Sequence, residues 1–107
     1  MFKFNEAEQS IKMNEGDFGV ILTFCFDDIE GTDIKFKIYE ISDKSSIIEK
    51  TFKSSDIVDN KIDLELTQEE SNKLEKKSYY WGLYQYVENK LKNTLIVNKI
   101  FKVEEGA

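Results

Sequence analysis

The side chains of this chain that could carry out chemistry are carboxylates, phenols and a single thiol. The sequence holds 21 Asp and Glu residues, five tyrosines and one cysteine, but no histidine. The most common general base and a frequent metal ligand are therefore missing. Cys25 stands in the middle of an apolar run with no imidazole to activate it, so we expect a buried, inert thiol rather than a nucleophile.

Paired carboxylates can hydrolyse glycosides, and clustered ones can bind calcium. The acidic residues of this chain are scattered over expected turns and wet strand faces, which indicates no catalytic pair. The densest group, Asp27 to Asp33, offers several oxygens but lacks the spacing and the final Glu of an EF-hand loop. We expect a solvated turn there in preference to a calcium site. The sequence predicts no enzyme, with no catalytic, cofactor-binding or metal-binding residue.

The remaining candidate is an aromatic segment from Tyr79 to Tyr86. Alternate side chains of a strand point to opposite faces. One set would point into a core: Tyr79, Trp81 and Leu83. The other set is a candidate surface for binding a protein partner or a sugar ring: Tyr80, Tyr84 and Tyr86. The alternative, which we prefer at this point, is that both faces of the strand are covered, one by the core and one by a loop.

These residues need a scaffold, and alternating apolar residues between turns predict about seven short strands. They cover residues 10–13, 18–26, 34–39, 47–52, 62–66, 78–87 and 94–103. The segment 18–26 is apolar at nearly every position, so we expect a central strand covered on both sides. Thr67 and Glu70 have the spacing of a capping box, which predicts a short helix before the aromatic strand.

The length of 107 residues predicts one domain that spans 1–107. Many short strands with turns between them are typical of a β-sandwich. We therefore predict an all-β fold, an immunoglobulin-like antiparallel β-sandwich with one short helix between strands. Near that helix, Leu74 and Tyr79 or Tyr80 could form a lock that resembles a tyrosine corner, with the phenol hydrogen-bonded to nearby backbone.

Charge and hydropathy indicate which partners to expect. The formal net charge is −6 and the sequence has no arginine, whereas nucleic-acid-binding surfaces are usually basic and rich in arginine. The first residues lack the apolar core of a signal peptide, and the longest apolar run, 18–26, is about half as long as a membrane span. We expect no nucleic acid, no membrane and no cofactor, and a protein that is cytoplasmic when it is made.

The order of several short motifs resembles the N-terminal domain of phage baseplate upper proteins and related small tail or fibre proteins. The motifs cover most of the chain and are Ile11–Asp17, Ile34–Ile38, Leu66–Ser71 with Leu74, Tyr79–Trp81, and Thr94–Ile96 with Phe101–Val103. The resemblance implies an immunoglobulin-like sandwich that docks onto other tail proteins, often as an oligomer. It carries over no catalytic residue. Baseplate proteins continue beyond this domain, so the resemblance implies a domain of a longer protein or a free-standing relative.

The leading hypothesis is therefore a noncatalytic virion structural or assembly module, associated with a tail or baseplate and active through protein–protein contacts. Its partners would be other phage structural proteins or further copies of the chain. The alternative is a carbohydrate-binding β-sandwich that uses Tyr80, Tyr84 and Tyr86 as a platform. A third hypothesis is an inhibitor or adaptor of a host protein.

Overall fold

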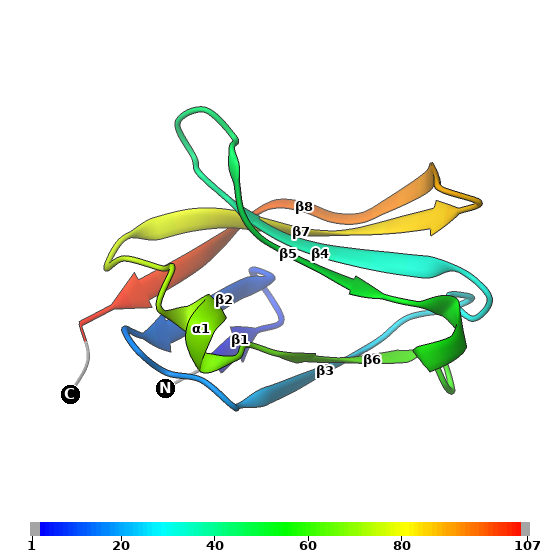
Figure 1. The fold of residues 1–107 in the computed structure, drawn as a ribbon, viewed down its shortest axis with the longest axis horizontal. Helices are drawn as coiled ribbons and strands as arrows, with labels where there is room; N and C mark the ends of the chain where they lie inside the picture. Colours follow the sequence, from blue (N-terminus) through cyan, green and yellow to red (C-terminus); the bar gives the residue numbers. More distant parts are fainter. Residues whose placement is uncertain (1–2, 106–107) are drawn as a thin grey trace.

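The computed structural model describes residues 3–105, which form two layers of β-structure (Figure 1). Six strands form one sheet in the order β1-β2-β8-β7-β4-β5, and β3 pairs with β6 in a second sheet. The strands are β1 Lys3–Asn5, β2 Ser10–Asn14, β3 Ile21–Cys25, β4 Asp33–Tyr39, β5 Ser46–Phe52, β6 Lys61–Glu65, β7 Ser78–Val87 and β8 Lys90–Glu104. A 3-10 turn, Ser54–Asp56, and a helix, α1 Gln68–Ser71, complete the described part of the chain.

The predicted all-β class is confirmed, but the predicted strand list is incomplete. β1 was not expected, and it makes eight strands within residues 3–105 where about seven were predicted. The sheet is also not purely antiparallel, because β2 and β8 pair in parallel, with Ile11 opposite Phe101. A parallel pair joins segments far apart in sequence, and the local pattern of apolar residues contains no signal for it.

The hydrophobic core lies between the two sheets, with Trp81 of β7 near its centre. Its side chain is fully buried, and its ring centroid lies 5.7 Å from that of Phe24 and 5.9 Å from that of Phe36. The indole Nε1 donates a hydrogen bond to the Gln9 carbonyl at 3.0 Å. The predicted inward set on β7 is confirmed, since Tyr79 and Leu83 are buried as well.

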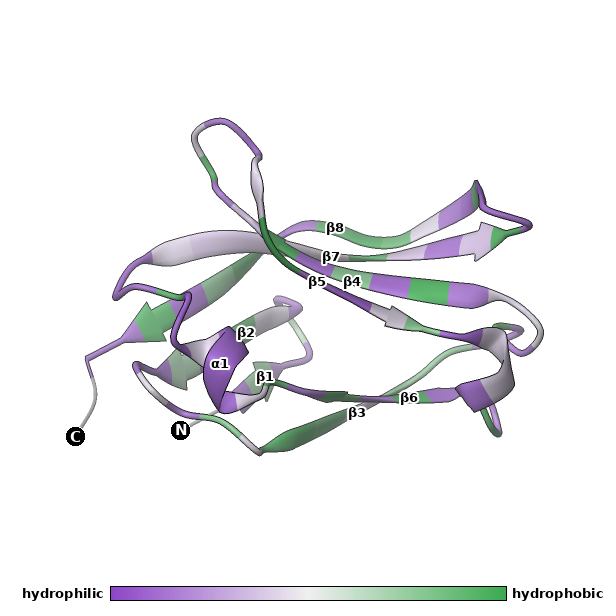
Figure 2. Ribbon diagram, viewed as in Figure 1, coloured by the Kyte–Doolittle hydropathy of each residue, from purple (hydrophilic) through white to green (hydrophobic). Residues whose placement is uncertain are grey.

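Alternation also places β4 and β6 as predicted. The core-facing residues of β4 are Ile34, Phe36 and Ile38, and those of β6 and its C-terminal end are Ile62, Leu64 and Leu66. Figure 2 shows the corresponding alternation of apolar and polar residues along β4. One face of each strand therefore packs in the core, while the opposite face is free to carry other functions.

The prediction for residues 18–26 is wrong. The strand begins only at Ile21, it belongs to the two-stranded sheet, and its outer face is open to solvent. Ile21 is 56% exposed, and Cys25, which we expected to be buried, is exposed. Apolar residues at nearly every position are typical of a doubly covered strand, but no element within residues 3–105 covers the second face.

The short helix connects the two layers. The predicted capping box is confirmed, because the Thr67 hydroxyl accepts from the Glu70 amide while the Glu70 carboxylate accepts from the Thr67 amide. Lys50 of β5 donates to Glu70 Oε1 at 2.9 Å and to the Glu65 carbonyl. The hydroxyl of Tyr79 accepts from the Glu75 amide at 2.8 Å, so Tyr79 makes the local phenol-to-backbone contact that we predicted for Tyr79 or Tyr80.

No helix within residues 3–105 has the length and the apolar character needed to cross a lipid bilayer.

Candidate functional site

The tyrosines singled out by the sequence gather on the outer face of the six-stranded sheet. We define the tyrosine face by Tyr39 of β4 together with Tyr80, Tyr84 and Tyr86 of β7. In the register between the two strands, Tyr39 lies opposite Tyr80. Tyr80, Tyr84 and Tyr86 are half-buried, whereas Tyr39 is 5% exposed. The three predicted residues therefore share one face, turned away from Trp81.

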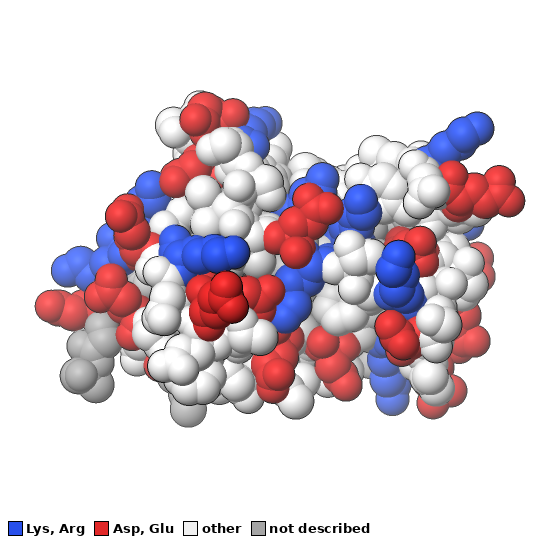
Figure 3. Space-filling view, in the orientation of Figure 1, with Lys and Arg blue, Asp and Glu red and all other residues white. Residues whose placement is uncertain are grey.

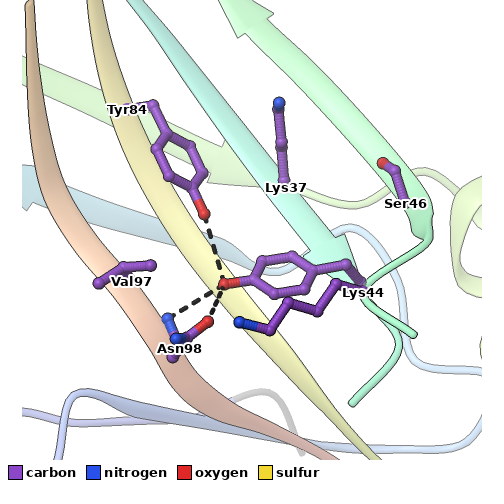
Figure 4. Close-up of a pocket in the computed structure, with 7 residues that line it drawn as sticks. Lys37, Lys44, Ser46, Tyr84, Val97 and Asn98 are labelled. Carbon is purple, nitrogen blue, oxygen red and sulfur yellow. Dashed lines mark hydrogen bonds between the residues drawn. The ribbon is translucent and has the colours of Figure 1, made fainter. Parts of the chain in front are cut away.

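Three hydrogen bonds fix the centre of this face, as Figure 4 shows. The Tyr39 hydroxyl donates to Asn98 Oδ1 at 2.7 Å and accepts from the Asn98 amide at 3.1 Å. The Tyr84 hydroxyl donates to the Tyr39 oxygen at 3.3 Å. Burial, reinforced by the hydrogen bond to Tyr39, raises the pKa of Tyr84 well above its ordinary value. The Tyr84 phenol is therefore neutral across the physiological pH range.

A β-bulge in β8 brings Asn98 to the tyrosine face. Trp81 pairs with Lys99 and Leu83 pairs with Ile96, so two residues of β8 lie opposite Gly82 alone. Asn98 has a φ of 53°, a left-handed conformation that asparagine adopts more readily than most residues. The bulge thus redirects one side chain of β8 toward Tyr39.

Gly82 makes room for the ring of Tyr84. A Cβ atom at this position would lie 2.7 Å from the Ile96 carbonyl oxygen and 2.7 Å from the Tyr84 hydroxyl oxygen. Both distances are shorter than any normal contact, so a larger residue would displace the ring or the backbone of β8. The absence of a side chain at residue 82 therefore allows Tyr84 to lie across the strand.

Beside this network lies a pocket of about 310 Å³. β4 contributes Lys37 and Tyr39, the β4–β5 connection and the start of β5 contribute Lys44 and Ser46, and the remaining lining residues are Tyr84, Val97 and Asn98. In Figure 1 the connection between β4 and β5 projects above the six-stranded sheet, and it forms one wall of the pocket. Four separate segments of the chain therefore build the pocket.

The lysines on this face differ in how their charges are compensated. The ammonium group of Lys35 lies 4.8 Å from the centre of the Tyr86 ring and 3.5 Å from Glu49 Oε1. The ammonium group of Lys37 lies 5.4 Å from the centre of the Tyr84 ring. Within residues 3–105, neither Lys37 nor Lys44 forms an ion pair with a carboxylate. Figure 3 shows that elsewhere, on the side of the molecule it displays, lysines and acidic residues are interspersed.

The acidic segment that we considered for calcium is a hydrogen-bonded turn. The Asn60 side-chain oxygen accepts from the amides of Ile29 and Glu30 at 2.8 and 3.1 Å, and Ile29 is fully buried. The Gln85 side-chain amide donates to the Asp28 carbonyl at 3.2 Å. In the described part of the chain, no three His, Cys, Asp or Glu side chains come together to hold a metal ion.

Tyr39, Asn98 and Lys44 of the β4–β5 connection also belong to this site, although no pattern in the sequence indicated them. The positive φ of Asn98, the pairing of β4 with β7 and the course of the β4–β5 connection bring them to the tyrosines, and none of these can be read from local periodicity. Chemically, the pocket offers aromatic surface, hydrogen-bond donors and positive charge, which are groups suited to binding.

No protein-family model matches this chain, and no curated protein or solved structure is significantly similar to it.

Proposed function

We propose that this domain is a noncatalytic assembly module that binds another protein through the tyrosine face, within a phage virion or a phage-derived particle. The observation that carries the proposal is the tyrosine face, on which Tyr80, Tyr84 and Tyr86 are half-buried. Hydrogen bonds hold the phenols of Tyr39 and Tyr84 in place on this face. Tyrosine provides a large contact area at a small cost in conformational entropy, and protein interfaces are enriched in it. The resemblance to baseplate and tail proteins supports the virion setting.

The arrangement of strands supports an immunoglobulin-like relationship as part of this proposal. The order β8-β7-β4-β5 matches the G-F-C-C′ strands of immunoglobulin variable-type domains, and the β3–β6 pair matches strands B and E. Tyr79 occupies the tyrosine-corner position at the start of β7, two residues before Trp81. Trp81 packs on Phe24 of β3, where immunoglobulin domains of antibodies carry a disulfide between strands B and F.

Sedimentation velocity tests the proposal. The purified protein is examined alone and with the products of the genes next to its own, and we expect a complex with itself or with one of these proteins. Tyr80→Ala should weaken that complex by about 2 kcal/mol, the magnitude typical of an interface hot spot. The matched control is Ile21→Ala, which removes an exposed apolar side chain from the other layer. A monomer that binds none of these proteins, or equal effects of the two substitutions, would contradict the proposal.

The pocket favours a second candidate function, the binding of a carbohydrate. Its volume of about 310 Å³ lies at the lower end of the range of small-molecule sites, and the ring of Tyr84 and the Asn98 amide line it. A glycan array with wild type, Tyr84→Ala and Tyr84→Phe tests this candidate. Selective binding that Tyr84→Ala abolishes and Tyr84→Phe largely retains would support stacking on the ring. Binding that is absent, or the same in all three proteins, would remove the candidate.

A further inference from the structure

The pocket between the β4–β5 connection and the bulge in β8 has a definite electrostatic character. We infer that it binds a carboxylate group of the protein partner, with Lys37 and Lys44 supplying the positive charge and Asn98 and Ser46 donating hydrogen bonds. This inference rests on the proposed function, since it names the chemical group by which the docked protein is recognised at the tyrosine face.

The first argument is charge. The chain as a whole is acidic, with a formal net charge of −6, and other lysines near this face have acidic partners. The Lys35 ammonium nitrogen lies 3.5 Å from Glu49 Oε1, and the Lys77 ammonium nitrogen lies 2.7 Å from Glu40 Oε1. Lys37 and Lys44, which both line the pocket, have no such partner in residues 3–105. Two lysines without a direct ion pair therefore line one pocket of an acidic protein, with Glu49 opposite Lys37 in the strand register, and together they attract an anion.

The second argument is the orientation of the hydrogen-bonding groups. Asn98 Oδ1 accepts the proton of the Tyr39 hydroxyl, which fixes the plane of the side-chain amide. Its NH₂ group and the Ser46 hydroxyl have no hydrogen-bond acceptor among residues 3–105, although both residues line the pocket. A carboxylate has two acceptor oxygens and no donor, so it complements two free donors and two ammonium groups.

The third argument concerns the kind of anion. The Tyr84 phenol adds no negative charge to the pocket, because burial and its hydrogen bond to Tyr39 raise its pKa well above the ordinary value. Phosphate sites commonly use arginine forks, helix N-termini or several free backbone amides. The chain has no arginine, and the backbone amide of Asn98 already donates a hydrogen bond to the Tyr39 hydroxyl. The donor set therefore fits a planar carboxylate better than a phosphate.

Titrations followed by amide NMR spectra of the full chain test the inference. The probes are N-acetylglycine, which represents a chain terminus, and the α-amide of N-acetylglutamic acid, which represents an acidic side chain. N-acetylglycinamide is the uncharged control, and inorganic phosphate is the competing anion. We expect saturable shifts at the amides of Lys44, Ser46 and Asn98 with the two carboxylates only. The carboxylate probe that binds more tightly identifies the source of the group on the partner.

Matched lysine variants locate the site. Lys37→Gln combined with Lys44→Gln should weaken carboxylate binding roughly tenfold or more, as expected for the loss of charge-assisted hydrogen bonds. Lys35→Gln removes the same charge from the same strand and face, but outside the pocket, and should change binding by less than about twofold. The same spectra report whether each variant is folded.

Three results would overturn the inference: equal shifts with the uncharged control, tighter binding of phosphate, or an equally large effect of Lys35→Gln. The complex with the partner separates the inference from the proposed function. If the double lysine variant binds the partner as tightly as wild type while Tyr80→Ala does not, the carboxylate assignment fails and docking at the tyrosine face stands. If neither substitution affects the partner, both proposals fail.

Discussion

At the scale of single residues, Trp81 is the side chain on which the core depends most. It is fully buried, contacts aromatic rings from three strands and has its indole nitrogen satisfied by the Gln9 carbonyl. Trp81→Ala should therefore lower the free energy of unfolding by about 3–5 kcal/mol. Urea unfolding followed by circular dichroism measures the change, with Val58→Ala, at a site that is 66% exposed, as the control. A cost as small as that of the control would mean that the two faces of β7 are reversed.

Residue patterns in the sequence were enough to place Trp81 but not to place Tyr39. Alternation along β7 identifies the inward set because each strand has only two faces. The same rule places Tyr39 on the solvent-facing side of β4 together with Lys37, yet the Tyr39 side chain is only 5% exposed. Its cover comes from Tyr84 and from Asn98, which is 59 positions away in the sequence and reaches Tyr39 through a bulge. Such non-local contacts leave no trace in the periodicity of a single strand.

At the scale of elements, the link between α1 and β5 depends on one carboxylate. Burial tends to raise the pKa of Glu70, but its hydrogen bonds to the Thr67 amide and to Lys50 outweigh that effect and hold the pKa below its ordinary value. Stability from these bonds is present above pH 4.5 and is lost as the pH falls through the lower pKa of the folded state.

Glu70→Gln should therefore cost about 1–2 kcal/mol at neutral pH, since it removes a charged acceptor from two bonds. The difference from wild type should shrink in acid, where both proteins carry a neutral side chain at this position. Urea unfolding at a series of pH values gives the measurement, and Glu69→Gln, one residue away in the same turn, serves as the control. A difference that persists unchanged into strong acid would exclude the charged interactions as its cause.

The capping box was predictable, whereas the place of β3 was not. Thr67 and Glu70 act within one turn, so their spacing alone indicates the helix start. β3 has apolar residues toward both faces, and only the layers that pack on its sheet decide whether both faces are covered. The sheet has two strands and no outer layer, which leaves Ile21 and Cys25 in solvent.

At the scale of the whole molecule, the two layers should differ in local stability. β7 has a neighbouring strand on each side, whereas β3 pairs only with β6. Two-stranded sheets are marginal by themselves, and local opening is easiest where few pairings hold an element. Amides in β3 should therefore exchange with deuterium faster than those in β7, as amide hydrogen exchange resolved by NMR can show. Equal protection in both layers would mean that the domain opens only as one cooperative unit.

The parallel pairing of β2 with β8 also determines how the domain responds to force. A pull on the two ends of the described chain first peels β1 from β2, because these strands are antiparallel and separate one pair at a time. The load then runs along β2 and β8 in opposite directions, and the pairs from Ile11–Phe101 to Asn14–Glu104 are strained in shear together. A domain built in this way resists stretching along its length far better than unzipping, which is a useful property for a part of any particle under mechanical tension.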